Sequence, residues 1–438
     1  MVQDRPLTAV IVGAGNRARL YASYAQAHPE ELQIVGVADP DPERCRSVQQ
    51  LYGFADNRLF SSAEALAEVP CLADLAINGT MDKDHVATSL PLLSQGYHLL
   101  LEKPIATSPQ EMQDLLRASR QHQRKVAICH VLRHAPFYTA VRQAVEDGEV
   151  GEIVNLQAVE HVSYHHAATA FVRGKWGNQE QSKSTMLMQK SCHDADLITW
   201  LNSGAVLEKV SSFGSRQNFR PEKAPAGAGQ RCLVDCEIEA DCAYSARKLY
   251  IDQTDRWNFY VWNIFRGEKD PFTREEKERR LRESSPFGRC VWHSENDVVD
   301  HQSVVGEFNN GSTFTLNMIA GTATPSRSIH IIGTKGELKG CFEDEQFVIR
   351  HFDATPGVDF RERVVQTRTG DTTSGESGTH GGGDLRLVGD FLNLLRGKPP
   401  SLSTTTLEDS LRGHLLVFAA DRSRLEGRQV EIEEFAFC

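Results

Sequence analysis

The sequence predicts an α/β protein whose N-terminal part is a doubly wound, parallel β-sheet. Short apolar runs alternate with stretches of helical periodicity, the pattern of successive βαβ units. The runs lie at residues 7–12, 32–38, 72–78, 96–101 and 125–128. A glycine-rich turn follows the first run, and a lysine beside a carboxylate follows the fourth. The chain has 438 residues, too many for one ordinary core, so two or more domains are expected.

The glycine-rich turn reads Gly13-Ala14-Gly15-Asn16-Arg17-Ala18, a G-x-G-x-x-A form of the dinucleotide-binding motif. In this motif the first glycine makes a tight turn and the second lets the backbone approach a pyrophosphate. The small third residue lets helix and strand pack closely. The free N–H groups at the following helix N-terminus then hold the phosphates. Gly13, Gly15, Asn16 and Arg17 are therefore candidate cofactor-binding residues.

The second apolar run ends in Asp39, which lies 24 positions after Gly15. An acidic residue near this place bonds the ribose hydroxyls of NAD in such domains. No basic residue follows Asp39 before Arg44, so NAD is expected rather than NADP. The alternative is that Asp39 merely caps a helix or forms a turn.

Glu102-Lys103-Pro104 follows the fourth apolar run, at the carboxyl edge of the sheet where ligands bind in open α/β folds. Pro104 must end the strand because it lacks a backbone donor. Burial and neighbouring charges can tune a lysine there for proton transfer. The alternative is an ordinary lysine in a strand-to-loop turn.

Composition narrows the classes of partner. The net charge is −11 and charged residues make up 24%, which argues against a nucleic-acid or anionic-membrane partner. No apolar run is long enough to span a membrane, and the first strand begins almost at Met1 without a signal-peptide pattern. We therefore expect a cytoplasmic protein. Ten cysteines in a chain of this length do not suggest a disulfide scaffold.

The Gly13–Ala18 motif, the Asn78–His85 loop and Glu102-Lys103-Pro104 together resemble the glucose–fructose oxidoreductase / inositol dehydrogenase / rhizopine-catabolism (Gfo/Idh/MocA) family. The resemblance implies a Rossmann domain at 1–128. It also implies a C-terminal α/β domain at 129–438 with an open-faced, mostly antiparallel mixed sheet. Such proteins use NAD(P), and the sheet face forms the substrate site and often a dimer interface, so a homodimer or homotetramer is expected. Thr80, His85 and Glu102 join the candidate cofactor-binding residues.

The resemblance also gives His193, in Gln189-Lys190-Ser191-Cys192-His193-Asp194, the place of a family histidine that faces the substrate carbon. Lys103 matches the usual proton-transfer residue. The family's sugar and polyol dehydrogenases often have an aspartate four positions before the histidine, where this chain has Gln189. That departure removes a carboxylate, and Lys190 adds a cation. Further candidate substrate contacts are Arg133, Tyr164, His165 and Trp176.

Residues 214–295 are expected to form a Cys-rich insertion. Cys232, Cys236 and Cys242 have the spacing C-x3-C-x5-C, and Cys290 follows later. Four thiolates could close a tetrahedral structural zinc site; reduced structural cysteines, a disulfide, or His293 as a ligand are the alternatives. Residues 368–383, rich in Gly, Ser and Thr, are expected to form a loop that could act as a lid.

Three functions are compatible with these features. The first is NAD-dependent hydride transfer from a hydroxyl of a sugar, polyol or sugar derivative, with Lys103 as acid/base and His193 orienting the hydroxyl. The second is a redox-neutral glycoside hydrolase that oxidises, eliminates, hydrates and reduces without consuming NAD. The third is a non-catalytic NAD-binding sensor, which the presence of both Lys103 and His193 disfavours.

Overall fold

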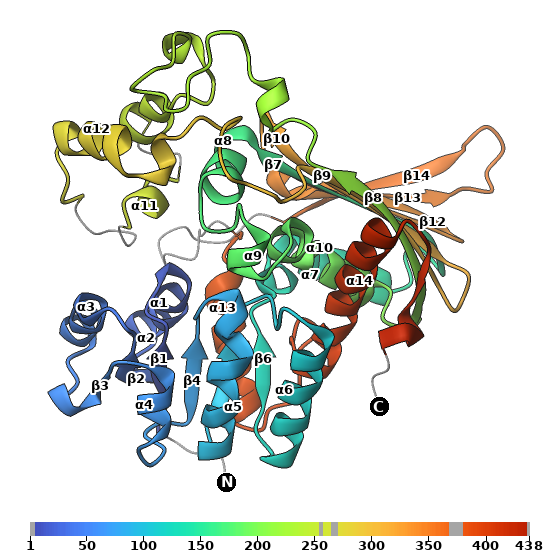
Figure 1. The fold of residues 1–438 in the computed structure, drawn as a ribbon. Helices are drawn as coiled ribbons and strands as arrows, with labels where there is room; N and C mark the ends of the chain where they lie inside the picture. The colour runs from blue at the N-terminus through green and yellow to red at the C-terminus, as the bar shows by residue number, and fades with distance from the viewer. Residues whose placement is uncertain (1–4, 254–256, 264–269, 368–379, 436–438) are drawn as a thin grey trace.

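The computed structural model describes residues 5–253, 257–263, 270–367 and 380–435, which form two sheets with helices around them (Figure 1). The first sheet has the strand order β3-β2-β1-β4-β5-β6 with every pairing parallel, so the predicted doubly wound sheet is confirmed. Its strands are β1 (Leu7–Val12), β2 (Leu32–Ala38), β3 (Leu59–Phe60), β4 (Leu75–Asn78), β5 (His98–Leu101) and β6 (Val126–Ile128).

Six helices connect or follow these strands, as expected for right-handed βαβ units. They are α1 (Asn16–Ala22), α2 (Tyr24–Ala27), α3 (Pro42–Tyr52), α4 (Ala63–Ala67), α5 (His85–Gln95) and α6 (Pro109–Gln121). The strand order reverses at β1 and β4, the switch point where ligands bind in such sheets. β1 and β2 have the predicted bounds, whereas the helix expected from the glycine motif to Ala27 is interrupted at Ser23.

The second sheet has the order β14-β13-β12-β11-β7-β10-β9-β8-β15. Only β7 and β10 pair in parallel, which confirms the predicted mostly antiparallel mixed sheet. The strands are β7 (Ile153–Ser163), β8 (Leu207–Ser215), β9 (His301–Phe308), β10 (Thr313–Thr322), β11 (Ser326–Gly333), β12 (Gly336–Cys341), β13 (Gln346–Phe352), β14 (Phe360–Gln366) and β15 (Val430–Glu431).

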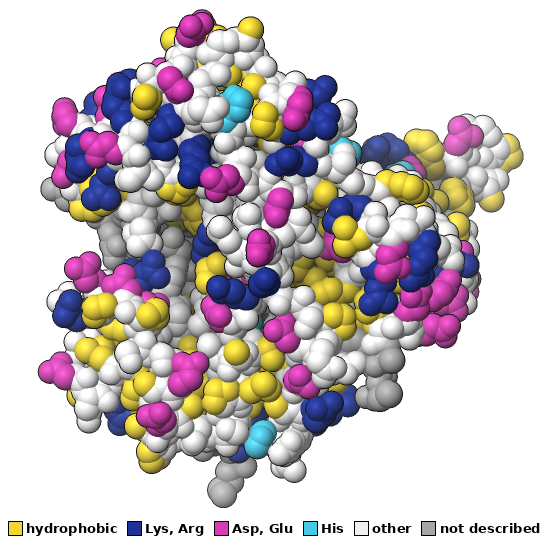
Figure 2. Space-filling model, viewed as in Figure 1, with side chains coloured by type: hydrophobic (Ala, Val, Ile, Leu, Met, Phe, Trp, Pro, Cys, Tyr) yellow, Lys and Arg dark blue, Asp and Glu magenta, His cyan; other side chains and the backbone are white. Residues whose placement is uncertain are grey.

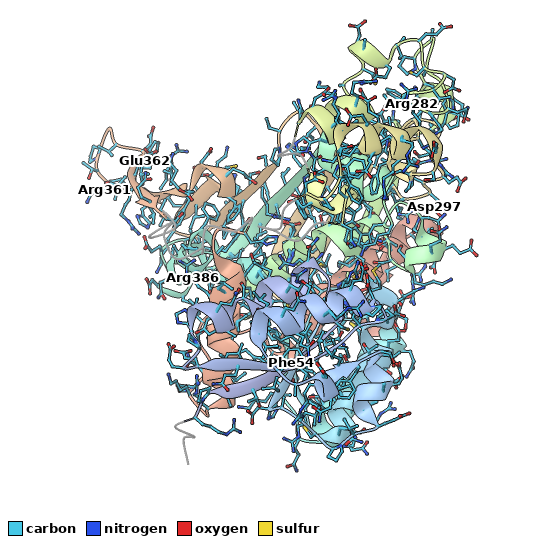
Figure 3. The ribbon with its side chains drawn as sticks, turned by 90° about the vertical axis from the view of Figure 1, so that its left-hand side faces the viewer. Phe54, Arg282, Asp297, Arg361, Glu362 and Arg386 are labelled. Atoms are coloured by element: carbon cyan, nitrogen blue, oxygen red, sulfur yellow. The ribbon has the colours of Figure 1, made fainter. Side chains whose placement is uncertain are left out.

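One face of this sheet is covered and the other is largely open. Phe314, Leu316 and Met318 of β10 are buried in the largest core cluster, while Ile319 is 39% exposed, which follows the period-2 alternation of a half-buried strand. The helices that accompany this half are α7 (Pro136–Glu146), α8 (Tyr164–His166), α9 (Gln179–Ser182), α10 (Met186–Leu201) and α14 (Leu407–Glu426). Figure 3 places Arg361 and Glu362 on the hairpin of β13 and β14, which projects away from the first sheet.

Two segments join the halves. Helix α13 (Gly383–Leu395) returns to the first sheet, where Leu387, Val388 and Phe391 complete its core. The insertion lies between β8 and β9 and carries α11 (Asn258–Val261) and α12 (Arg274–Glu283). It stands over the side of the first domain that carries α1 and α3 (Figure 1), and Arg44 donates to Asn263 across this boundary at 2.9 Å.

Charges of both signs are interspersed over the face shown in Figure 2. Among the described residues, no helix has both the length and the apolar character needed to cross a bilayer. The loop predicted at 368–383 lies mostly outside the described residues.

Candidate functional site

The turn after β1 is shaped by close backbone contacts. Gly13 has φ +75°, and a Cβ there would lie 2.8 Å from the Thr80 backbone nitrogen. At Gly15 a Cβ would meet nothing within 4 Å, so the space in front of α1 is open where the motif requires a pyrophosphate. Ala18 packs under Gly79, where an added Cβ would lie 2.8 Å from that of Ala18. The turn therefore fits a dinucleotide phosphate on the N-terminus of α1, which begins at Asn16.

Asp39 lies beside this turn, at the end of β2. Its carboxylate accepts the backbone N–H of Ala14 at 2.7 Å and that of Asp41 at 2.8 Å. The Arg44 guanidinium approaches the same carboxylate at 4.0 Å. Asp39 is thus placed to receive ribose hydroxyls, while Arg44 stands closer to it than the sequence spacing suggested.

Arg17 points into a buried charge network. Its guanidinium donates to Glu102 at 2.7 Å and to Asp384 at 2.5 Å, and it also contacts the Tyr21 hydroxyl. Burial would raise the pKa of Glu102, but the charges of Arg17 and Lys103 outweigh burial and hold that pKa below its usual value. Arg17 and Glu102 therefore tie α1 to β5 and α13, and both are occupied by protein contacts.

The loop after β4 is braced in the same way. Asn78 accepts the Thr80 hydroxyl at 2.8 Å. The His85 ring, 1% exposed, bridges the carbonyls of Pro104 at 2.6 Å and Thr80 at 3.2 Å. His85 thus holds the Glu102–Pro104 turn against the Thr80 loop, so its ring nitrogens face protein carbonyls.

Lys103 reaches the second domain. Its ammonium donates to the Gln189 carbonyl on α10 at 2.7 Å. His193 lies four residues further along α10, so the two positions share one face of the helix. Burial, then Lys103, His130 and His380, hold the pKa of His193 well below its usual value, which keeps its imidazole neutral. The Lys103 ammonium therefore meets the backbone of α10 four residues before His193, and its charge acts on that imidazole.

His193 belongs to a row of histidines that sequence reasoning missed. Its ring centroid lies 5.6 Å from that of His130 and 5.8 Å from that of His380, and His130 lies 5.4 Å from His414. Burial, then His130, lowers the pKa of His414 to about 3. These residues lie at positions 130, 193, 380 and 414, on separate segments of the chain, so no local motif predicts that they meet.

Lys190 lies in a second charge network on the sheet. Its ammonium contacts Glu160 at 2.8 Å, and Arg327 contacts Glu160 and Asp194 at 2.7 Å each. Burial raises the pKa of Asp194 to about 6 against the effect of Arg327. Glu160 and Arg327 face each other across β7 and β11, which the sequence alone could not pair.

Gln189 replaces the aspartate expected from the family resemblance, and its amide is partly satisfied. The Nε2 atom donates to the Ser182 hydroxyl at 3.1 Å and the Ser184 carbonyl at 2.9 Å. Its Oε1 atom is buried and has no protein partner within the described part of the chain. Gln189 therefore offers an acceptor, without a negative charge, near Lys103.

The remaining predicted substrate contacts are scattered. Arg133 is 1% exposed and its guanidinium grips Asp196 at 2.5 and 2.7 Å and also contacts Asp409. Trp176 donates to Asp82 at 3.4 Å and stacks on Tyr260 at 5.5 Å. Tyr164 lies 5.3 Å from His165 and 5.7 Å from Tyr244 of the insertion, centroid to centroid. The structure thus brings Lys103, Lys190 and His193 together on or near α10, and Arg133 reaches the same helix through Asp196. Tyr164, His165 and Trp176 make the contacts described above away from this helix.

The cysteines of the insertion line one small cavity, which has room for about one water-sized atom. Its walls include Cys232, Cys236, Cys242 and Cys290. All four are free thiols. In the described ranges, no three His, Cys, Asp or Glu side chains already stand at metal-binding spacing.

Comparisons with known proteins agree with this geometry. The model of the GFO_IDH_MocA oxidoreductase family, NAD-binding Rossmann fold, matches residues 7–130. The model of that family's C-terminal alpha/beta domain matches residues 142–432.

Individual relatives are distant. YteT of Bacillus subtilis (strain 168), named as an oxidoreductase, is 22% identical over 400 residues, 89% of each chain. D-glucoside 3-dehydrogenase of Escherichia coli (strain K12) is 28% identical over 149 residues, 34% of this chain and 41% of that one. The WlbA dehydrogenase of Bordetella pertussis, solved with NADH and UDP-GlcNAcA, has the same fold at TM-score 0.67 and 17% identity, over 98% of this chain and 99% of that one.

Proposed function

Because the chain belongs to the Gfo/Idh/MocA family of NAD(P)-binding oxidoreductases, we propose that it oxidises a hydroxyl of a sugar, polyol or sugar derivative with NAD. The observation that carries the proposal is the bond from the Lys103 ammonium to the α10 backbone at Gln189, four residues before His193, whose imidazole is held neutral. Two relatives, a glucoside dehydrogenase and a dehydrogenase solved with a nucleotide sugar, support the substrate class. The proposal includes a domain boundary near residue 128, with NAD bound by the N-terminal domain and the substrate by the C-terminal domain.

The open turn over Gly13 and Gly15, the free N-terminus of α1 and Asp39 fit NAD, which supplies the hydride acceptor when bound. The substrate hydroxyl lies between Lys103 and His193. Lys103 first releases its ammonium proton to solvent; as the C–H bond then gives up its electron pair, the hydroxyl proton passes to the resulting amine, and a carbonyl forms. In the reverse direction the Lys103 ammonium returns that proton.

His193 orients the hydroxyl in this scheme, because a neutral imidazole can accept or donate a hydrogen bond there without adding charge. Glu102 fixes Lys103 by accepting its backbone N–H at 2.5 Å. Gln189 and Lys190 complete the substrate contacts that we assign. Arg133 is left out because Asp196 and Asp409 occupy its guanidinium, and Tyr164, His165 and Trp176 are weaker assignments near the insertion.

The first test follows cofactor and sugar signals together by proton NMR, with the protein, NAD and a panel of sugars, polyols and glycosides. Formation of NADH together with a keto-sugar is the expected result. Release of an aglycone with NAD unchanged would instead favour the redox-neutral hydrolase. NAD binding without turnover across a broad panel would favour the sensor and count against our proposal.

The Lys103→Met variant tests the residue assignment. It should lower kcat by about 10²–10⁴-fold, the usual contribution of one acid/base group, and leave NAD affinity unchanged. Lys125→Met is the matched control, because Lys125 also bonds a backbone carbonyl, that of Leu394, away from α10. Unchanged turnover in Lys103→Met would sink the assignment of Lys103 as the proton-transfer residue.

A further inference from the structure

We propose that the four cysteines of the insertion bind one zinc ion, which holds the insertion together independently of hydride transfer. Cys232, Cys236, Cys242 and Cys290 come from two segments of the insertion, and all four line one cavity. Thiolates are preferred zinc ligands, and four of them make a closed structural site. Three features support the site: the backbone bonds around this cavity, the positive charge of Arg173 and the indole N–H of Trp292, which is unpaired in the described part of the chain.

The backbone already brings the cysteine segments together. The Cys232 N–H donates to the Gly288 carbonyl at 3.0 Å, and the Cys290 N–H donates to the Gln230 carbonyl at 2.9 Å. Arg231 and Arg289 form a β-bridge between the two segments. The bridge therefore fixes the positions of Cys232 and Cys290 relative to each other. The two segments are distant in sequence, since Cys232 and Arg289 lie 57 positions apart.

Helix α12 closes the arrangement from outside. Arg282, which Figure 3 places on the insertion, donates to the Leu233 carbonyl next to Cys232. Arg231 donates to the Leu281 carbonyl of the same helix at 2.5 Å. The charged helix thus packs its backbone and side chains onto the segment that carries Cys232 and holds that segment in place.

Arg173 supplies the charge argument. Its side chain is buried, with 4% of the residue exposed, and its guanidinium donates to the Arg289 carbonyl at 2.6 Å, the Tyr244 carbonyl at 2.8 Å and the Cys232 sulfur at 3.4 Å. Within the described chain it has no carboxylate partner. A buried cation without an anion is costly. Glu239 also lines the cavity, but its carboxylate contacts Arg247 and Ser245, which leaves the four thiols as the further source of negative charge.

A zinc–thiolate centre resolves this imbalance. Binding one divalent ion to four thiols releases four protons and leaves two net negative charges, one of which Arg173 compensates. Trp292 lines the same cavity, and its indole N–H is buried without a protein partner among the described residues. An indole N–H can donate to a metal-bound sulfur. The sulfurs reach one ion by rotating about χ1 between staggered positions, since they are not yet at ligand spacing.

The test begins with zinc content, measured by plasma mass spectrometry on the full, untagged protein from cells grown without added zinc. We expect about one zinc ion per chain. Cys232→Ser and Cys290→Ser should each lose most of it, whereas the exposed Cys71→Ser should keep it. Zinc retained in both variants, or absent from the unaltered protein even after refolding with zinc, would overturn the proposal.

A second measurement covers variants that fail to fold. Titrating the unaltered protein with an organomercurial should release the zinc as about four thiols react. Cobalt substituted for zinc should show the visible absorption of a tetrahedral sulfur site. An intact mass below that of the fully reduced chain would instead identify a disulfide among these cysteines and refute the zinc site.

Discussion

At the scale of single residues, Asp39 contacts both the glycine turn and, in our proposal, the cofactor ribose. Its two oxygens accept backbone N–H groups from Ala14 and Asp41, and a carboxylate retains lone pairs for further donors. An amide at this position would turn its own N–H toward one of those donors. Asp39 therefore fixes the backbone of the glycine turn and, in our proposal, also contacts the ligand.

We accordingly predict that Asp39→Asn weakens NAD binding by about 10–100-fold, the equivalent of about 1.5–3 kcal/mol for hydrogen bonds to a charged group. Titration calorimetry with NAD measures this change directly. Asp41→Asn is the control: Asp41 caps α3 by accepting from Glu43, so its loss should lower stability but spare NAD affinity. Equal affinities for the Asp39 variant and the unaltered protein would contradict the role given to Asp39.

The residues show where sequence reasoning stops. The motifs located Gly13, Asp39 and Lys103 because they constrain the backbone within a few positions. The same motifs suggested cofactor contacts for Arg17 and His85, yet Arg17 bonds Asp384, 367 positions away, and His85 braces the Pro104 carbonyl. A side chain's partner depends on which distant element packs beside it, and one sequence carries no direct record of that packing.

At the scale of elements, the contact between α1 and the end of β4 is the tightest part of the cofactor site. Ala18 on α1 leaves no space for a side chain at Gly79, whereas Gly15 faces open space. The two glycines therefore have different functions, although both lie in turns that follow strands of the first sheet. Gly79 permits packing, and Gly15 permits the approach of a phosphate.

This difference predicts opposite outcomes for the same substitution. Gly15→Ala should fold with nearly unchanged stability and lose NAD affinity, because its Cβ occupies the space needed by the pyrophosphate. Gly79→Ala should lose about 1–3 kcal/mol of stability, as expected for overpacking, together with NAD affinity. Urea denaturation and NAD titration on both variants separate the two effects; a stable Gly79→Ala protein with normal NAD binding would disprove the packing argument.

At the scale of the whole molecule, the sequence predicted both sheets but not how the chain returns between them. Alternating strands and helices determined the first sheet, and β1 and β2 have the predicted ranges. The return of α13 to the first core, and the pairing of Glu160 with Arg327, arise from contacts across more than a hundred residues. These long-range contacts also assemble the row of histidines.

That row makes the stability of the molecule depend on pH. Burial lowers the pKa of His414 to about 3 and also lowers the pKa values of His130, His193 and His380 in the row. Outside the row, burial lowers the pKa of His134 to about 4. Below about pH 6.5 the unfolded chain therefore binds protons that the folded chain refuses. Each such imidazole lowers the free energy of unfolding by up to about 1.4 kcal/mol per pH unit as the pH falls.

Asp194 acts in the opposite direction, because its raised pKa of about 6 makes its contribution to folding larger in acid and smaller as the pH rises from about 4 to 6. Burial also raises the pKa values of Asp196 and Asp421. The five imidazoles outnumber these three carboxyls, so urea denaturation at intervals from pH 7 to 5 should show stability falling with acid. His414→Gln should reduce the proton uptake on unfolding by about one, because glutamine can still accept from the Ile105 N–H that His414 accepts at 2.8 Å. His122→Gln, at the end of α6 and not buried, is the matched control. Equal pH slopes for the His414 and His122 variants would show that the buried row does not set the acid sensitivity.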